Sequence, residues 1–464
     1  MVKISKTTQN LFDKLYDLAS QIDSEIYAVG GYVRDLVLGR ESKDIDFVVI
    51  GDALQLARKF KSKYSVKAYT QFPRFGTCMF EYGSFKIELV SARKESYESD
   101  SRKPQVERSD LYTDLSRRDF TINALAMQLD KKNRIADPYN GIDDIHNKVI
   151  RTPLDPEKTF SDDPLRMMRA IRFATTLGFT IEPRVLKAIR QESVRLDIIS
   201  QERINDEFSK IIMADVPSTG ILLLDQTNLL NIFLPEFVQT KGTEQRHKYH
   251  HKDVFYHTLE VLDKIAQLSA SLRLRLVALF HDIAKPKTKR FDEKVGWTFH
   301  GHEIIGERMS ASILKRMKYP GHIIEYVRKL IRLHLRPMVL VSEDVSDSAI
   351  RRLLFLAGED FEDLMTLCRA DITSKNPKTV KRHLRNYEIV LEKAKLVEEK
   401  DHIRRFRCPV DGVEIMEKFN LSPGPQIGKI KKFLEEAILD GHVSNEHDSV
   451  LRYMLEHRRE LLDA

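Results

Sequence analysis

"VGGYVRDLVLGRESKDIDFVV" (residues 29–49) decides the fold of the first part of this chain. An apolar run leads into a pair of glycines, a short helical pattern follows, and a second apolar run carries Asp44 and Asp46. Alternate residues of a strand share one face, so both carboxylates point to one place while Ile45 and Phe47 point into the core. The stretch therefore predicts a strand, a turn, a helix and a second strand that bears two carboxylates.

The two carboxylates are candidate metal ligands. Held this close, they repel each other unless a cation lies between them. Oxygen ligands favour Mg²⁺, which also binds phosphate oxygens. Glu88, in "FKIELV" (85–90), lies on another expected strand and is a candidate third ligand. Because Asp-x-Asp is common without a metal, the interpretation depends on its context.

The glycine pair, Gly30 and Gly31, lies between the first strand and a helix that carries Arg34. Backbone amides at such a turn can approach a triphosphate that a Cβ would obstruct. The alternative is a tight turn that needs glycine for its geometry alone.

Short strands are expected at 26–31 and 43–51, with a hairpin at 76–92, which together predict a small mixed sheet. After about residue 155 strand patterns almost vanish. Helical spacing then predicts helices at 163–177, 184–193, 201–213, 253–269, 272–284, 301–317 and 320–335. The outline is an α+β head followed by a long α-helical body.

The chain has 464 residues, which exceeds one ordinary core and suits several domains. Loop residues near 233–237 and 374–377 indicate boundaries. We expect a head at 1–150, a helical neck at 151–235, a second helical domain at 236–375 and a helical tail at 376–464.

The composition indicates a globular protein with a polyanionic partner. The net charge is +7 and the pI is about 9.0, although a solvated surface explains such an excess equally well. The three cysteines are far apart without zinc spacing, which favours a reducing compartment. No signal-peptide stretch and no run of about 18 apolar residues occurs. We expect a cytoplasmic protein with no membrane partner, and make no prediction of its oligomeric state.

Two further stretches complete an ordered pattern: "DLSRRDFTINALAM" (114–127) and "DDPLRMMRAIRFATTLGF" (162–179). With residues 29–49 they resemble, in order and spacing, the class II tRNA nucleotidyltransferases. These are the CCA-adding enzymes, close relatives of the bacterial poly(A) polymerases within the polymerase-β superfamily. The resemblance covers about the first 215 residues and extends more loosely to the C-terminus.

The resemblance implies that Asp44 and Asp46 bind two Mg²⁺ ions, with Glu88 as the third catalytic carboxylate. The metals would activate the RNA 3′-hydroxyl for attack on the α-phosphate of a nucleoside triphosphate and would stabilise the leaving pyrophosphate. It assigns nucleotide binding to Gly30, Gly31, Arg34, Arg117, Arg118, Asp119 and Asn123. By chemistry alone, the two adjacent arginines could equally be surface charges.

Asp163 and Arg166 form a candidate reader of nucleobases. Cytosine and adenine both present an amino donor beside an unprotonated ring nitrogen, whereas uracil and guanine present the reverse. A carboxylate beside a guanidinium therefore fits the first pair and repels the second. The two residues are three apart on an expected helix, hence neighbours on one face. The resemblance places them in the E-D-x-x-R motif that reads both bases.

One residue departs from this motif, since Asp162 stands where glutamate is usual. Arg169 and Arg172 continue the basic flank, toward nucleotide phosphate, RNA or neighbouring acids. A structural explanation also applies, because Asp163 followed by Pro164 is a good helix start.

The segment at 92–114, "ARKESYESDSRKPQVERSDLYTD", is polar and poor in aliphatic residues, which predicts a long exposed loop. In the family that the chain resembles, a flexible loop here helps the pocket switch from C to A. Enzymes that add only C have it shortened. Its length therefore favours complete CCA addition.

The second half carries a separate group of histidines, typical of transition-metal sites. The pattern resembles an HD-type phosphohydrolase domain, which some bacterial CCA-adding enzymes carry. The candidate ligands are His257, His281, Asp282, His302 and His334, with His300 nearby and Asp371 as a candidate last ligand. The resemblance implies a divalent metal and hydrolysis of 2′,3′-cyclic or 2′-phosphate ends. An inactive HD scaffold that packs against RNA is the alternative.

The tail segment 409–441 resembles the part of these enzymes that grips the tRNA elbow. Its basic residues, as in "KIKK" (429–432), would contact phosphates and give salt-sensitive binding without sequence readout. A charged helical surface is the alternative.

The leading expectation is a CCA tRNA nucleotidyltransferase that uses CTP and ATP without a nucleic-acid template, with tRNA as its partner. The nearest alternative is a bacterial poly(A) polymerase with the same head, which the HD pattern and the tail disfavour. An alternative from another class is an HD metal-dependent phosphohydrolase whose head only binds nucleotide. A non-catalytic RNA-binding protein would leave the carboxylates unexplained.

Overall fold

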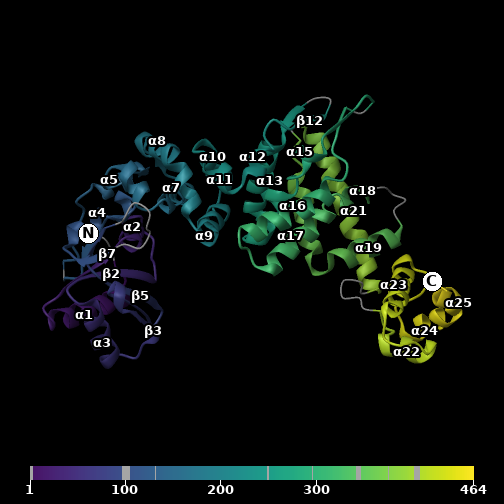
Figure 1. The fold of residues 1–464 in the computed structure, drawn as a ribbon, viewed down its shortest axis with the longest axis horizontal. Helices are drawn as coiled ribbons and strands as arrows, with labels where there is room; N and C mark the ends of the chain where they lie inside the picture. The colour runs from purple at the N-terminus through teal and green to yellow at the C-terminus, as the bar shows by residue number, and fades with distance from the viewer. Residues whose placement is uncertain are drawn as a thin grey trace. The chain divides into compact units, whose positions relative to one another are not determined.

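The computed structural model describes residues 4–96, 105–130, 132–247, 250–294, 296–340, 346–374, 376–401 and 408–463. The chain forms two compact units, residues 1–235 and 236–464 (Figure 1). The finer division into head, neck, second domain and tail stays a prediction.

The first unit begins with a seven-stranded mixed sheet, as expected. Its order is β3-β4-β5-β2-β1-β8-β9, with β2 and β5 parallel and the flanking pairs antiparallel. The strands are β1 (Glu25–Val29), β2 (Asp44–Ile50), β3 (Lys67–Phe72), β4 (Thr77–Tyr82), β5 (Phe85–Ser91), β8 (Ala126–Gln128) and β9 (Ile135–Ala136). The expected α+β head with a small mixed sheet is therefore confirmed.

Helices α1 (Lys6–Ser20), α2 (Gly31–Val37) and α3 (Ala53–Lys63) accompany this sheet, followed by α4 (Leu111–Ser116) and α5 (Gly141–Asn147). Phe12 of α1 packs edge-to-face on Phe47 of β2, with ring centroids 5.8 Å apart. Both rings are fully buried. Burial of this face of β2 commits the alternate residues, Asp44 and Asp46, to the opposite face.

The segment at 92–114 differs from the expected loop at its two ends. There β6 (Arg93–Ser96) and β7 (Gln105–Arg108) pair as an antiparallel ribbon. The centre of the segment, 97–104, lies outside the described residues. A ribbon of polar residues gives no apolar alternation, so the sequence pattern could not reveal these strands.

The rest of the first unit is helical. Its helices are α6 (Pro156–Asp162), α7 (Leu165–Leu177), α8 (Pro183–Glu192), α9 (Gln201–Ile212), α10 (Pro217–Gln226) and α11 (Leu229–Phe233). Gly178 ends α7 in the left-handed conformation, with φ of 69°. A short parallel pair, β10 (Val149–Ile150) and β11 (Thr180–Ile181), joins the start of this region to the end of α7.

The second unit is a helical body with two small ribbons. It contains α12 (Pro235–Val238), α13 (Val254–Leu268), α14 (Leu272–Phe280), α15 (Lys285–Thr288), α16 (His302–Arg316), α17 (Gly321–Leu333), α18 (Arg336–Val339), α19 (Asp347–Ala357), α20 (Phe361–Asp371) and α21 (Pro377–Asp401). The ribbons are β12 (Glu244–His247) with β13 (His250–Asp253), and β14 (Arg290–Asp292) with β15 (Gly296–Thr298). The helix expected at 272–284 ends four residues early, because the backbone leaves the helix at the His281–Asp282 pair.

The last four helices are α22 (Gly412–Phe419), α23 (Pro425–Asp440), α24 (His447–Glu456) and α25 (Arg458–Asp463). They share a small core that includes Ile415, Leu434 and Met454. Arg352 of α19 forms an ion pair with Asp440 of α23 at 2.9 Å. Phe355 of α19 also packs against this core, so these helices dock on the body through apolar contacts as well as charge pairs.

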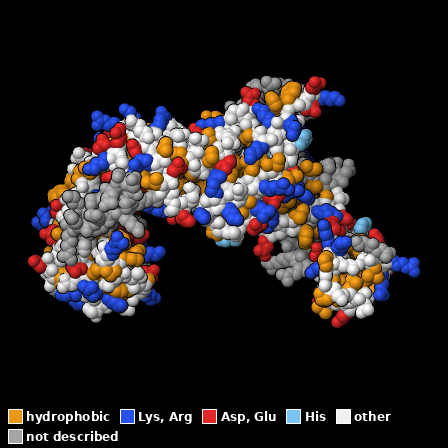
Figure 2. Space-filling view, in the orientation of Figure 1, with side chains coloured by type: hydrophobic (Ala, Val, Ile, Leu, Met, Phe, Trp, Pro, Cys, Tyr) orange, Lys and Arg blue, Asp and Glu red, His pale blue; other side chains and the backbone are white. Residues whose placement is uncertain are grey.

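Among the residues that the structure describes, no helix is both long and apolar enough to span a bilayer. On the face shown in Figure 2, lysine and arginine side chains are scattered among acidic ones over both units. The net positive charge is thus spread over this face rather than gathered in one stripe.

Candidate active site and metal centre

The head carboxylates meet on one face of the sheet. Asp46 of β2 is the register partner of Glu88 on the parallel strand β5, so the two side chains lie next to each other. Asp44 is two residues earlier on the same face, and both aspartates are exposed. On the other side, Asp46 pairs with Val29, the residue at which β1 reaches the glycine turn. The predicted carboxylate cluster and the predicted turn are therefore adjacent.

Asp46 and Glu88 line a small cleft together with Arg117 and Arg118. Solvent still reaches Asp46, but the surrounding protein desolvates it and raises its pKa. The attraction of Arg118 opposes this shift, and the negative charge of Asp44 adds to it. A carboxylate that is costly to ionise next to another gains strongly from a bound divalent cation, so this oxygen donor set fits Mg²⁺.

The two arginines are held by a residue that we did not single out from the sequence. Asp114 of α4 is fully buried, and its carboxylate lies 2.6 Å from Arg117 Nη2 and 3.2 Å from Arg118 Nη2. Burial acts to raise the pKa of Asp114, but the two guanidinium groups outweigh it and hold that pKa below its usual range. Helical spacing of three and four residues was the signal for this clamp. The arginines are therefore anchored groups rather than mobile surface charges.

The two glycines of the turn differ in what the protein requires. Gly30 has φ of 70°, and a Cβ there would lie 2.8 Å from Arg118 Nη1. Turn geometry alone explains this glycine. A Cβ at Gly31 would find its nearest neighbour, Arg34 Nη2, at an ordinary contact distance of 3.5 Å. Crowding by the protein itself does not explain Gly31.

Arg34 is buried and takes part in a chain of polar contacts. Its Nη1 donates to Asn123 Oδ1 at 2.7 Å, and its Nε donates to Asp35 Oδ1 at 2.9 Å. Asn123 Nδ2 donates to Asp119 Oδ1 at 3.0 Å, and Arg169 Nε donates to Asp119 Oδ2 at 2.7 Å. This series of polar contacts connects α2, the helix after the glycine turn, to α7. In this arrangement the buried side chain of Arg34 stabilises the glycine turn through its hydrogen bonds inside the protein.

Asp119 is the centre of that chain. Burial acts to raise its pKa, but the charge of Arg169 and the hydrogen bond from Asn123 outweigh burial and lower the pKa to about 2. Asp119 is therefore ionised at any physiological pH, and its charge fixes Arg169 at the edge of the site.

The candidate base reader occupies the break between two helices. Asp162 ends α6, and Asp163 follows it before α7 begins. Asp163 Oδ1 accepts a hydrogen bond from the backbone N–H of Leu165 at 3.2 Å, which caps α7 as the sequence suggested. Arg166 Nη2 donates to the backbone carbonyl of Arg117 at 2.7 Å. The motif of 162–179 and the arginine pair are therefore directly joined.

Arg172 takes one of the alternatives that the sequence left open. Its Nε lies 2.5 Å from a carboxylate oxygen of Glu207, a buried residue of α9. Lys210 pairs with the same carboxylate at 3.0 Å. Arg172 thus ties α7 to α9 by way of a neighbouring acid, and Glu207 is a second buried acid that the sequence analysis did not identify.

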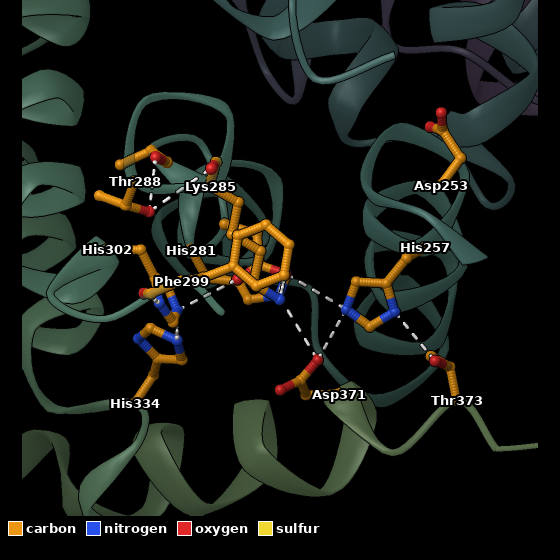
Figure 3. A network of polar contacts seen from close by, with 12 residues as sticks. Asp253, His257, His281, Lys285, Thr288, Phe299, His302, His334, Asp371 and Thr373 are labelled. Atoms are coloured by element: carbon orange, nitrogen blue, oxygen red, sulfur yellow. Dashed lines mark hydrogen bonds and ion pairs between the residues drawn. The ribbon is translucent and has the colours of Figure 1, made fainter. Parts of the chain in front are cut away.

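In the second unit, the predicted histidines converge (Figure 3). Asp371, at the end of α20, joins them, whereas His300 is exposed. The six converging residues are His257, His281, Asp282, His302, His334 and Asp371. The first five are almost completely buried.

These six residues form two triads rather than one. In the first, His257 Nε2 and His281 Nε2 lie 2.9 and 3.4 Å from the same carboxylate oxygen of Asp371. The second comprises Asp282, His302 and His334, and in each triad the ligand atoms lie within 4.8 Å of one another.

Asp282 contacts both triads. Its Oδ2 lies 3.3 Å from His281 Nε2 and its Oδ1 lies 3.4 Å from His302 Nε2. Its two oxygens therefore face two neighbouring positions, which is the arrangement of a bridging carboxylate.

Each imidazole ring is oriented by a contact at its Nδ1 atom, on the side away from the centre of the cluster. The Nδ1 atoms of His281, His302 and His334 lie 2.8, 2.7 and 2.6 Å from backbone carbonyl oxygens. A ring nitrogen that faces a carbonyl carries a proton, so Nε2 is the atom of each ring that faces the centre and can bind a metal in place of a proton. His257 Nδ1 is likewise held, by the Thr373 hydroxyl at 2.9 Å. Such outer support is typical of metal-binding histidines.

The charges of the cluster also fit divalent cations. Burial acts to lower the pKa of His281, but Asp282 and Asp371 outweigh it and raise that pKa to about 10. Burial and the nearby His281 lower the pKa of His334 to about 4. His281 Nε2 is buried and makes no hydrogen bond of good geometry within the described part of the chain. The buried Asp282 carboxylate, the partly buried Asp371 carboxylate and the converging imidazoles are a donor set that suits transition metals.

Comparison with known proteins agrees with this organisation. Three family models match in order: the poly A polymerase head domain at 26–151, the "probable RNA and SrmB- binding site of polymerase A" at 178–240, and the HD domain at 254–374. Together they cover more than half of the chain, including both clusters described above.

Curated relatives match three quarters or more of the chain. The A-adding tRNA nucleotidyltransferase of Deinococcus radiodurans is 31% identical over 91% of this chain and 93% of its own length. The CC-adding tRNA nucleotidyltransferase of Thermus thermophilus is 28% identical, with 92% of each chain covered. The multifunctional CCA protein of Pseudomonas fluorescens is 32% identical over 75% of this chain and 84% of its own.

Solved structures share the fold. The CCA-adding enzyme of Bacillus stearothermophilus in complex with CTP matches with a TM-score of 0.66 and 23% identity, covering 98% of this chain and 99% of that one. A Thermotoga maritima CCA-adding enzyme complexed with tRNA matches with a TM-score of 0.61 and 21% identity, covering 98% and 96%. With the family models and the curated relatives, this establishes that the chain belongs to the tRNA nucleotidyltransferase family and carries the poly(A) polymerase-type head and an HD domain.

Proposed function

We propose that this protein adds C, C and A to the 3′ end of tRNA from CTP and ATP, without a nucleic-acid template. The observation that carries the proposal is the register of β2 and β5, which brings Asp46 beside Glu88 with Asp44 on the same face. Enzymes with this head use divalent metal ions, and we propose Mg²⁺, held by these three carboxylates. Bound there, Mg²⁺ would activate the primer hydroxyl and stabilise the leaving pyrophosphate.

Binding of the phosphates and positioning of the glycine turn are proposed to fall to side chains and backbone of the protein itself. Arg117 and Arg118, clamped by Asp114, are proposed to neutralise phosphate charge on the incoming nucleotide. Gly31 leaves room for phosphate to approach the backbone, since the protein does not itself fill the Cβ position. The Arg34–Asn123–Asp119–Arg169 chain is proposed to hold this turn in register with α7.

Nucleotide choice is proposed to lie with Asp163 and Arg166. A carboxylate that accepts from the amino group and a guanidinium that donates to the ring nitrogen select C and A over U and G. Relatives that add CC, that add A and that carry the multifunctional CCA name all match this chain. Addition of all three nucleotides rests on the length of segment 92–114, whose ends form the β6–β7 ribbon. CC addition alone and A addition alone are the alternatives within the family.

The test is nucleotide incorporation into a tRNA transcript that lacks its CCA end, with Mg²⁺, CTP and ATP. We expect two C residues with CTP alone and a final A when ATP is also present. Untemplated ATP addition to any RNA, without use of CTP, would instead assign the protein as a poly(A) polymerase. The three buried, unpaired cysteines are in keeping with the cytoplasmic location that such an enzyme requires.

A second activity is favoured by the six-residue cluster of the HD domain. We propose hydrolysis of phosphate esters at RNA 3′ ends: the two triads, both of which Asp282 contacts, would hold divalent transition-metal ions, and these would activate the attacking water. HD-domain enzymes use divalent metals. An inactive scaffold would have to keep two converging carboxylates, one of them buried, and four oriented imidazoles without using them. The test is hydrolysis of bis(p-nitrophenyl) phosphate with added Mn²⁺, Co²⁺ or Ni²⁺, and its loss in Asp282→Asn.

A further inference from the structure

The only tryptophan of this sequence, Trp297, lies on the β14–β15 ribbon of the second unit. It is the direct cross-strand partner of Phe291, and the two ring centroids are 5.1 Å apart at 73°. Phe291 is 58% exposed, and Trp297 is only partly buried. The pair stabilises the ribbon. Phe291 and part of Trp297 stay open to solvent side by side, and adjacent exposed aromatic rings are one element of a site that stacks nucleobases.

The stretch that forms this ribbon is basic. Lys289 Nζ lies 4.4 Å from the centroid of the Trp297 ring, as a cation over an aromatic face. Residues 285–298 contain five lysines or arginines against two acids. These are Lys285, Lys287, Lys289, Arg290 and Lys294 against Asp292 and Glu293. Exposed rings interleaved with positive charge suit single-stranded nucleic acid, whose bases stack while its phosphates pair with lysine.

The ribbon is continuous with the HD cluster. Its second strand leads into Phe299, whose carbonyl oxygen lies 2.7 Å from His302 Nδ1 and so orients a candidate metal ligand. Lys285 Nζ lies 5.6 Å from the Phe299 ring centroid and 2.6 Å from Asp282 Oδ2. Lys285 and Phe299 are both labelled in Figure 3. Both ends of the stretch that bears the aromatic pair thus contact residues of the cluster.

We propose that Phe291 and Trp297 form a stacking platform for the unpaired nucleotides at an RNA 3′ end, next to the HD cluster that acts on the terminal phosphate. The proposal deepens the second activity stated above and rests on it for the chemical step. Binding at the platform needs only the rings and the lysines. An acidic protein segment would use the lysines without needing the rings, and this difference is what the test exploits.

Trp297 is the only tryptophan of the sequence, so the tryptophan fluorescence of the protein reports on contacts made at this residue. The full-length protein, kept in EDTA to prevent hydrolysis, is titrated with a single-stranded RNA tetranucleotide that ends in a 3′-phosphate. An abasic tetramer with the same number of phosphates is the matched probe. We expect saturable quenching by the RNA and at least about tenfold weaker binding of the abasic tetramer. Equal responses, or no quenching by the RNA, would overturn the platform.

Variants test the same claim. Phe291→Ala should weaken RNA binding about tenfold, whereas Phe72→Ala, which removes an exposed ring of the other unit, should leave the titration unchanged. The same binding for Phe291→Ala as for the unchanged protein would contradict the proposal.

A catalytic readout separates the platform from the hydrolase. For Trp297→Ala, kcat/KM for an RNA that ends in a 2′,3′-cyclic phosphate should fall at least about fivefold more than kcat/KM for bis(p-nitrophenyl) phosphate. Trp297→Phe should recover most of the difference. Equal losses on both substrates would mean that Trp297 only supports the fold, and the proposal would fall. If the unchanged protein hydrolyses neither substrate, the second activity is wrong, and the fluorescence titration alone decides on the platform.

Discussion

Asp46 of β2 and Glu88 of β5 are register partners in the only parallel pair of the seven-stranded sheet. Their side chains therefore leave the same face next to each other, with Asp44 two residues along β2. We expect Asp46→Asn to lower nucleotide incorporation at least about a hundredfold, because one oxygen ligand loses its charge while the shape is kept. Glu88→Gln should also impair incorporation. Lys67→Gln, an exposed residue of the edge strand β3, is the control and should retain activity; full activity of Asp46→Asn would disprove the metal assignment.

The two glycines of the turn should separate folding from nucleotide binding. Gly30→Ala places a Cβ against Arg118 Nη1 at a backbone φ of 70°. We therefore expect the free energy of unfolding to fall by about 1–2 kcal/mol. Nucleotide incorporation should fall as well. Gly31→Ala meets no close atom of the protein. It should keep the thermal transition and raise KM for CTP and ATP. A Gly31→Ala enzyme with unchanged KM would show that the turn serves geometry alone.

Asp163 should control the choice of base. Asn in its place still caps α7 at Leu165, so Asp163→Asn removes the charge with little effect on the helix. We expect the preference for CTP over UTP in single-nucleotide incorporation to fall at least about tenfold. Asp162→Glu, which restores the usual family residue at the end of α6, should keep the preference. An unaltered preference in Asp163→Asn would place base reading elsewhere.

Asp119 should make the stability of the first unit depend on pH. Its pKa in the folded protein is about 2, below the ordinary value of 3.8, so its ionisation stabilises the fold above about pH 4 and this contribution is lost as the pH falls toward 2. This shift in the pKa of Asp119 corresponds to about 2 kcal/mol of folding stability at pH 7, of which about half is lost by pH 3. In urea unfolding near pH 7, the free energy of unfolding of Asp119→Asn should be lower than that of the unchanged protein. This difference should narrow toward pH 3. A gap independent of pH would contradict the charge pair with Arg169.

The two triads of the HD domain predict the number of bound metal ions. After loading with Mn²⁺ or Co²⁺ and dialysis, we expect about two ions per chain. Asp371→Ala and His334→Ala should each lose about one, and Asp282→Ala should lose both, because Asp282 contacts both triads. His300→Ala, an exposed histidine outside the triads, is the matched control. One ion in the unchanged protein, or one ion left in Asp282→Ala, would rule out a bridged pair.

Local patterns in the sequence predicted much of this molecule. Alternation of apolar and acidic residues predicted the strand with Asp44 and Asp46, and helical spacing predicted α7 and α9 to within two residues. The partners of these elements could not be predicted in the same way. That Glu88 pairs with Asp46 depends on strand order, which no local pattern contains.

The buried acids show the same limit. Asp114 and Glu207 each hold a basic pair; the spacing of three and four residues indicates the partners of Asp114, but such spacing is equally common for surface acids, and only the fold shows that both carboxylates are buried. The separation of the histidine cluster into two triads likewise depends on how helices from different parts of the second unit pack together. The β14–β15 ribbon has strands of three residues, too short for alternation to be recognised.

The central claim, CCA addition by the head, is tested most directly by reading the 3′ ends of a tRNA transcript lacking CCA after incubation with all four nucleotides and Mg²⁺. An unrelated single-stranded RNA serves as competitor. We predict that the tRNA ends in CCA and stops there, while the competitor is unchanged. Growth of A tracts on both RNAs, tRNA that stops at CC, or tRNA that stays unextended unless it already ends in CC before incubation, would contradict it.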